Sequence, residues 1–126
     1  MPVDIPGANQ VIVWFGKWPS FHDAEILEVH LNQEGLSWVK IYTWNTTDKV
    51  DGQGYYVMDK HAVVTFALED ISELELNGFS SQNVIGGLDV DRTNEGYRLS
   101  FHPCYGLTGT LEAKKVSVEL KPGKPV

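Results

Sequence analysis

The chain has 126 residues, a formal net charge of −7 and a hydrophobic fraction of 42%. These values are typical of one folded globular domain and exclude an intrinsically disordered chain. The acidic balance argues against nucleic acid and anionic membranes as partners, because both bind basic surfaces. No apolar run reaches the roughly 18 residues needed to span a bilayer. The single cysteine cannot form an internal disulfide, and the N-terminus has no signal-peptide pattern, so we expect a cytoplasmic protein.

Alternating apolar and polar residues, separated by turn-forming residues, predict a series of short β-strands. In chain order these strands are residues 25–31, 36–44, 62–68, 71–76, 97–101, 107–113 and 115–120. Residues 45–53 are polar and rich in turn formers, and they predict the longest loop. Glu69-Asp70 predicts a turn, and because Asp70 with Glu73 also resembles a helix start, a helix stays open as an alternative to the strand at 71–76. The segments 1–10 and 121–126 are expected to be irregular.

The connections between these strands are too short for helical crossovers, so antiparallel pairing is expected. Residues 80–88 have no clean period, and helix, strand and loop all stay open for them. The sequence therefore predicts a single α+β domain over residues 1–126, mainly β, with about seven antiparallel strands and one or two short helices. The expected core residues are Phe21, Leu27, Val29, Val64, Phe66, Leu68, Tyr97, Leu99 and Phe101.

A polar cluster of His22, Asp23 and Glu25 lies at the mouth of the first predicted strand. We interpret it as a structural corner, in which Asp23 accepts hydrogen bonds from nearby backbone amides. Two alternatives stay open: a metal-dependent or hydrolytic enzyme built on these three residues, and a small-ligand module. The cavity of such a module would be lined by the aromatic residues Trp38, Tyr42 and Trp44. Because the histidines and the cysteine match no known catalytic or metal-binding spacing, no catalytic residue, metal ligand or cofactor is predicted.

Residues 61–91 contain six carboxylates and no Lys or Arg. Within a strand, Glu73 and Glu75 would point away from Leu74 and Leu76 and reach solvent together. A concentrated negative potential accelerates encounter with a basic partner, while aromatic side chains anchor interfaces. The residues predicted to bind a partner are therefore Asp70, Glu73, Glu75, Asp89, Asp91 and the aromatic Trp18. The aromatic residues at positions 14–21 fit either a binding patch or the plug of one end of a barrel or sandwich.

Three parts of the sequence resemble the immunity protein 50 family. They are WPSFHDAE at 18–25, LELNGF at 74–79 with QNVI at 82–85, and YGLTG at 105–109. The resemblance spans residues 14 to 120 and implies a small bacterial protein that protects its producer by binding a secreted polymorphic toxin. It supplies no catalytic residues, and we interpret its motif residues as structural: Phe21, His22, Asp23, Glu25 and Tyr105. The implied partner is a cognate protein toxin, and a basic toxin such as a nuclease would complement the acidic surface. The oligomeric state stays open.

Overall fold

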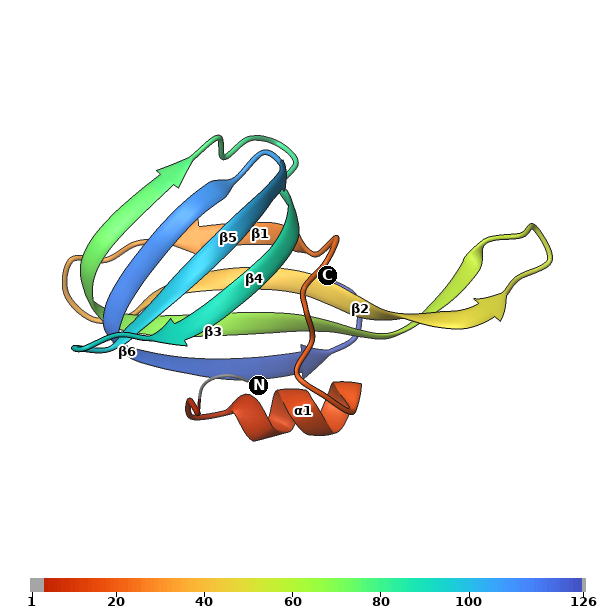
Figure 1. Ribbon diagram of the computed structural model, residues 1–126, viewed down its shortest axis with the longest axis horizontal. Coiled ribbons are helices and arrows are strands. Elements are labelled where there is room, and N and C mark those ends of the chain that lie inside the picture. The colour runs from red at the N-terminus through yellow and green to blue at the C-terminus, as the bar shows by residue number, and fades with distance from the viewer. Residues whose placement is uncertain (1–3, 126) are drawn as a thin grey trace.

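The computed structural model describes residues 4–125 and contains one short helix and six antiparallel strands (Figure 1). The elements are α1 (Ala8–Phe15), β1 (Glu25–His30), β2 (Ser37–Val50), β3 (Tyr56–Asn77), β4 (Val84–Arg92), β5 (Tyr97–Tyr105) and β6 (Thr108–Pro122). The strands form one sheet that closes into a barrel in the order β1-β2-β3-β6-β5-β4. The predicted fold class, mainly β with antiparallel strands and a short helix, is confirmed.

The long strands β3 and β6 run through both halves of the barrel. β3 pairs with β2 over residues 56–68 and with β6 over residues 62–77, whereas β6 pairs with β5 only over residues 109–113. At Asp70 the backbone φ is +56°, and a bulge follows between Ile71 and Glu73. The predicted turn at Glu69-Asp70 is therefore a bend inside β3, because pairing with β6 continues on both sides of it. The two predicted strands at 107–113 and 115–120 likewise belong to one strand, β6.

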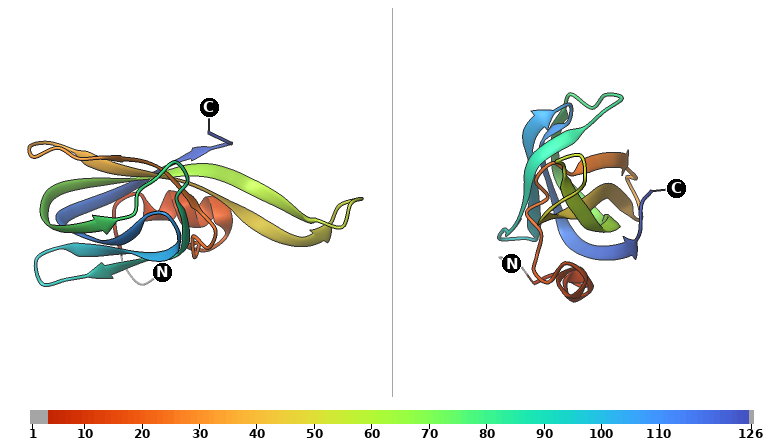
Figure 2. Two further views of the ribbon diagram at one scale, coloured as in Figure 1. Left: turned by 90° about the horizontal axis from the view of Figure 1, so that it is seen from above. Right: turned by 90° about the vertical axis from the view of Figure 1, so that its right-hand side faces the viewer.

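The barrel closes through a seam between β1 and β4, where only Glu25 and Val84 are paired. Residues 17–24, which connect α1 to β1, lie along this seam. Their backbone bonds to β4: Asp23 N–H donates to Ile85 O over 2.9 Å, and Leu88 N–H donates to Ser20 O over 3.3 Å. Viewed along its long axis, the sheet curls around its interior while α1 lies outside (Figure 2).

The hydrophobic core is one cluster of apolar side chains from all six strands, residues 17–24 and the inner side of α1. Most of the predicted core is buried, namely Phe21, Val64, Phe66, Leu68, Leu99 and Phe101, and Val29 and Tyr97 pack against it half-buried. Leu27 is 39% exposed, so its predicted burial is wrong. A bulge between Ile26 and Glu28 interrupts the alternation in β1, and Ile26 is buried in its place.

Beyond the barrel, β2 and β3 continue as a projecting two-stranded hairpin, residues 45–60 (Figure 1). The loop predicted at 45–53 is therefore wrong, because residues up to Val50 belong to β2. The turn itself is held by the Asp51 carboxylate, which accepts the N–H groups of Gln53 and Tyr55 over 2.9 and 3.0 Å. Most residues of the hairpin are exposed, so its strands lack the buried face that alternation detects.

Other element ends also differ from the predicted ones. Residues 8–10, expected to be irregular, begin α1, and residues 121–122 end β6. Residues 80–83 form a loop and β4 begins at Val84, which settles the open segment 80–88. β5 continues through Pro103 to Tyr105, with irregular β4–β5 pairing at that point. Residues 1–3 and 126, parts of the expected irregular ends, lie outside the described residues.

Candidate functional site

The WPSFHDAE segment turns its aromatic side chains into the barrel. Phe21 is buried, and its ring centroid lies 6.0 Å from that of Phe66 and 5.9 Å from that of Trp18. The Trp18 ring is half-buried and lies 6.2 Å from Phe66 in an edge-to-face arrangement. Trp18 and Phe21 form an aromatic plug on Phe66 under the seam. Of the aromatic residues at 14–21, these two follow the plug interpretation, whereas the Trp14 indole bonds to Lys60 O at the root of the hairpin. Trp18 was also predicted to contact a partner, and only the exposed part of its half-buried ring could do so.

Of the polar side chains in the same segment, His22 and Asp23 lie together and Glu25 lies elsewhere. The His22 ring places Nδ1 3.0 Å from Gly86 O and Nε2 3.6 Å from an Asp23 carboxylate oxygen, whereas Glu25 lies on β1 opposite Tyr42. The Asp23 carboxylate, expected to accept backbone amides, instead lies beside His22, and the Asp23 backbone N–H is the group that bonds to β4. Within residues 4–125, no three His, Cys, Asp or Glu side chains are gathered so that they could hold a metal ion.

Asp23 is constrained by its backbone, since its φ is +65°, while its side chain is 58% exposed. Left-handed backbone costs an ordinary residue about 1–2 kcal/mol, and it costs glycine little. We therefore expect Asp23→Val to lower the free energy of unfolding by about 1–2 kcal/mol, whereas Asp23→Gly changes it by less than about 1 kcal/mol. Urea denaturation of both variants measures the difference. Equal losses in both variants would show that the carboxylate, and not the backbone, is what the fold requires.

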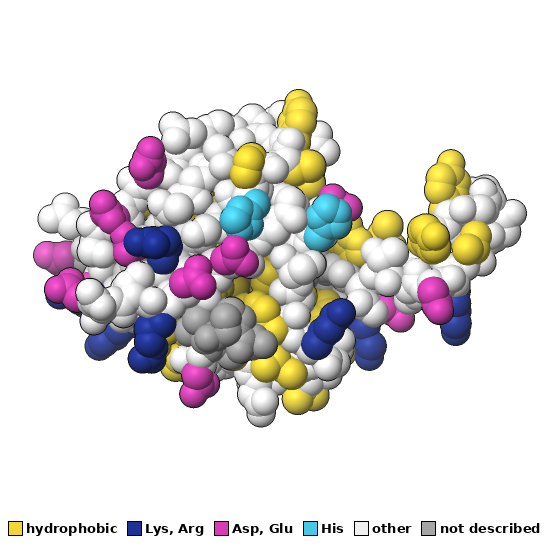
Figure 3. All heavy atoms as spheres, in the orientation of Figure 1, with side chains coloured by type: hydrophobic (Ala, Val, Ile, Leu, Met, Phe, Trp, Pro, Cys, Tyr) yellow, Lys and Arg dark blue, Asp and Glu magenta, His cyan; other side chains and the backbone are white. Residues whose placement is uncertain are grey.

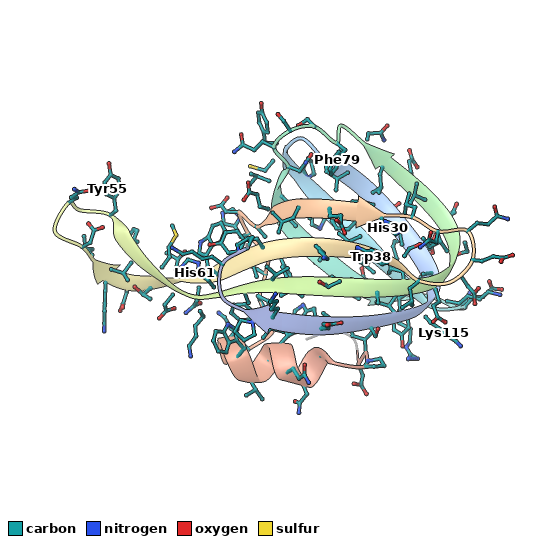
Figure 4. The ribbon with its side chains drawn as sticks, turned by 180° about the vertical axis from the view of Figure 1, so that it is seen from behind. His30, Trp38, Tyr55, His61, Phe79 and Lys115 are labelled. Atoms are coloured by element: carbon teal, nitrogen blue, oxygen red, sulfur yellow. The ribbon has the colours of Figure 1, made fainter. Side chains whose placement is uncertain are left out.

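The aromatic residues of β2 lie on the outside of the barrel. Trp38 stacks on His30 with ring centroids 4.0 Å apart, and the two lie side by side in Figure 4. The Tyr42 hydroxyl lies 2.7 Å from His61 Nδ1, and its ring packs 5.0 Å from Trp44. Burial, and secondly the nearby Glu25 charge, raises the pKa of Tyr42. Because these rings pack on one another and on histidines rather than around a cavity, the small-ligand alternative has no site here.

The two later motif segments meet at a buried asparagine. Asn83 Oδ1 accepts the N–H groups of Ser80 and Leu107 over 2.9 and 3.2 Å, and its Nδ2 donates to Ser80 O over 3.0 Å. Gly106 approaches so closely that a Cβ there would lie 2.5 Å from Gln82 O. Asn83 thereby fastens the β3–β4 loop to the β5–β6 turn. Sequence reasoning missed this role, although an asparagine between two turn regions was a usable signal.

Tyr105, unlike the buried Asn83, is exposed to solvent. Its side chain is 61% exposed at the end of β5, where its backbone pairs with Val84. The YGLTG motif contributes to the fold through the close backbone contacts of Gly106 and Gly109, the Leu107 amide and the buried Leu107 side chain, rather than through the tyrosine ring.

Four of the predicted acidic residues gather on the outer face of the β4-β5-β6-β3 part of the barrel. The pairing register places side chains from four strands in two adjacent rows, since directly opposed residues share a face. The rows are Asp91, Arg98, Glu112 and Glu73, and then Asp89, Ser100, Thr110 and Glu75. We call these eight residues the acidic face. It holds five carboxylates and one guanidinium, so its formal charge is 1 − 5 = −4, and acidic side chains spread over this region in Figure 3.

The charges of the acidic face are only partly compensated. Arg98 Nη2 lies 3.3 Å from Glu112 Oε1, and Asp89 Oδ2 lies 2.6 Å from Nε2 of the neighbouring His102. A hydrogen bond between the Glu73 and Glu112 carboxyl groups raises the pKa of Glu73, and the Glu112 charge adds to this effect. Glu112 and Arg98 were missed from the sequence, because only the strand register brings them beside Glu73.

Asp70 lies apart from the acidic face. It is exposed at the bend of β3, beside a separate hollow whose lining includes Leu31, Leu74 and Lys114. A partner bound on the acidic face would therefore reach Asp70 only by extending past the bend.

The three segments noted in the sequence are in contact with one another. The first is bonded to the second through Asp23 N–H and Ile85 O, and the second to the third through Asn83 and Leu107. A model of the immunity protein 50 family matches residues 7–121. The chain belongs to this family. No curated protein and no solved structure matches the chain.

The matched range contains the aromatic plug, the Asn83 hydrogen bonds and the whole acidic face. In this member of the immunity protein 50 family, the residues of the three segments form backbone and core contacts that close the barrel. Within the part of the chain that is described, no helix is long and apolar enough to cross a membrane.

Proposed function

We propose that this protein neutralises a secreted bacterial toxin by binding it directly in the cytoplasm of the producing cell. The observation that carries the proposal is the match to the immunity protein 50 family over residues 7–121. Neutralisation by binding requires no catalytic group or cofactor of its own. His22 and Asp23 lie side by side, but among the described residues they form no group of three with Glu25 that could hold a metal ion, which favours this function over an enzyme built on all three.

The acidic face is our proposed docking surface for the toxin, with a basic toxin such as a nuclease as the favoured class. Its carboxylates come from three strands and lie on the same outer face of the sheet, so their negative electrostatic potentials add on that side of the protein. Such a field steers a basic protein toward the surface and raises the association rate constant. Asp89, Asp91, Glu73 and Glu75 are the partner-binding residues on this face, and Asp70 and the exposed part of Trp18 would lie at or beyond its edge.

The function is tested with the reading frame directly upstream of the gene. We expect the C-terminal toxin domain encoded there to arrest growth of a bacterial host, and co-expression of this protein to restore growth. The two purified proteins should also form a stable complex in size-exclusion chromatography. Absence of growth rescue would contradict the proposal, and rescue without a complex would contradict direct binding.

Charge reversal tests the proposed surface. Replacing Glu73 and Glu75 with lysine should slow association with the toxin by roughly tenfold or more at low salt, because the steering field is strongest there. The free energy of unfolding should change by less than about 0.5 kcal/mol, since both residues are exposed. Stopped-flow kinetics at several salt concentrations measures the effect.

The control for this experiment changes the net charge equally at other positions. Glu34 and Glu119 are exposed on the β1–β2 turn and on the distal part of β6. Their replacement by lysine should leave the association rate within about threefold of the wild-type value. Equal slowing by both pairs would assign the effect to net charge and not to the acidic face.

A further inference from the structure

The hairpin of residues 45–60 carries a concentration of exposed apolar side chains. They are Val50 (56% exposed), Tyr55 (68%), Tyr56 (63%), Val57 (38%) and Met58 (49%). Hydrophobic atoms are visible on the projecting hairpin in Figure 3, and Figure 4 shows Tyr55 at its far end and His61 near its root. A two-stranded hairpin is marginally stable by itself, and a cluster of exposed apolar residues marks an interaction surface.

One edge of this hairpin is open. In the described residues β3 pairs only with β2 between Tyr56 and Asp59, because pairing with β6 begins at Ala62. Thr47 Oγ1 donates to Val57 O over 2.7 Å, so the peptide groups of Val57 face β2. Successive residues of a strand point their N–H and C=O groups in opposite directions, and those of Tyr56 and Met58 therefore face the open edge.

The open edge ends at Lys60. There the carbonyl oxygen accepts the indole N–H of Trp14 over 3.0 Å, and a φ of +55° bends the strand. The indole of α1 thus occupies the edge at its inner end. A short stretch centred on Val57 is left for another strand.

We propose that this edge pairs with the same edge of a second copy of the chain, about a two-fold axis at Val57. In that antiparallel register Val57 lies opposite Val57 of the second copy, and Tyr56 lies opposite Met58. The outward peptide groups of Tyr56 and Met58 then form hydrogen bonds with those of the second copy. The Tyr56 ring of each copy contacts the Met58 thioether sulfur of the other copy. Tyr55 falls opposite Asp59, so no like charges are opposed.

The charge distribution favours a second copy at this place. Two copies of a chain with a net charge of −7 repel each other, but residues 52–58 carry no charged side chain. The neighbouring charges alternate in sign, as Asp48, Lys49 and Asp51 before this stretch and Asp59 and Lys60 after it. The hairpin also projects away from the β4-β5-β6-β3 part of the barrel, so both acidic faces stay free in the pair (Figure 1). The joined hairpins form a four-stranded sheet in the order β2-β3-β3-β2.

Sedimentation velocity of the full chain from low to high micromolar concentration tests the proposal, without any toxin present. We expect a concentration-dependent dimer that is strengthened by added salt, because salt screens the repulsion between two acidic chains. Val57→Lys and Val57→Glu each place like charges on the two-fold axis and should weaken dimerisation by about tenfold or more. An equimolar mixture of the two variants should restore a heterodimer, since opposite charges then meet at the axis.

The matched controls are Leu36→Lys and Leu36→Glu, which change an exposed apolar residue of the β1–β2 turn. Both should dimerise like the wild-type chain, and circular dichroism of all variants checks that they fold. A wild-type chain that stays monomeric at high micromolar concentration overturns the proposal, as does a dimer that Val57→Lys leaves intact. A monomer whose Val57 variants lose toxin binding would assign the hairpin to the toxin instead, and it too overturns the dimer.

Discussion

Replacing Phe66 with alanine is expected to lower the free energy of unfolding by about 3–5 kcal/mol. Phe66 is fully buried in β3, and its ring contacts both members of the aromatic plug, Phe21 and Trp18. Truncation removes the surface on which the plug rests and leaves a cavity under the β1–β4 seam. Because β1 and β4 are paired at a single position, the backbone bonds of residues 17–24 to β4 and the plug beneath them hold this seam together.

Urea denaturation monitored by the summed fluorescence of the four tryptophans measures this loss. The matched control is Phe79→Ala, which truncates a ring that is 55% exposed in the β3–β4 loop. We expect the control to cost less than about 1 kcal/mol. A loss below about 1 kcal/mol for Phe66→Ala would mean that the plug repacks and does not depend on this ring.

The sequence predicted the fold class and most of the core, because strands with one buried face alternate clearly. Val64, Phe66 and Leu68 in β3 and Leu99 and Phe101 in β5 are examples, all buried as expected. Alternation failed where its physical basis is absent. In the hairpin most side chains are exposed to solvent, so neither face is buried. In β1 the bulge between Ile26 and Glu28 shifts the alternation by one residue, so Ile26 is buried and Leu27 is exposed.

The continuity of the long strands was not predictable from local sequence for a related reason. Asp70 is a turn-forming residue, but hydrogen bonds from β6 on both sides of it hold the chain in the sheet. Those bonds come from residues some 40 positions later in the chain. Only the tertiary pairing decides whether such a residue ends a strand or bends it.

The acidic face was predictable from the sequence only in part. Four of its carboxylates were singled out from charge distribution alone, and the register brings them onto one surface. The register also adds Glu112 and Arg98, whose positions in sequence lie outside the acidic stretch. Binding of a toxin to this face stays a prediction, and the lysine substitutions at Glu73 and Glu75 are its direct test.

Asn83 is expected to be the polar residue whose loss costs the most. Its side chain is 4% exposed and makes three hydrogen bonds, two of them as acceptor from Ser80 and Leu107. In Asn83→Ala the backbone N–H groups of Ser80 and Leu107 lose their hydrogen-bond acceptor. The Leu107 amide is so deeply buried that water cannot take the place of the lost Asn83 oxygen. An unsatisfied buried donor costs about 1–3 kcal/mol, so we expect a total loss of about 2–4 kcal/mol in the free energy of unfolding.

Asn94→Ala provides the control, because Asn94 is exposed in the β4–β5 turn and should change stability by less than about 0.5 kcal/mol. Hydrogen exchange adds a local readout. In Asn83→Ala the Leu107 amide should exchange much faster, while amides in the β2–β3 pairing of the barrel change only by the global loss of stability. If the Leu107 amide stays as protected as those of β3, another group must accept its hydrogen bond. The β3–β4 loop would then be held to the β5–β6 turn by the close backbone contact between Gly106 and Gln82 O. This contact is possible because glycine has no Cβ.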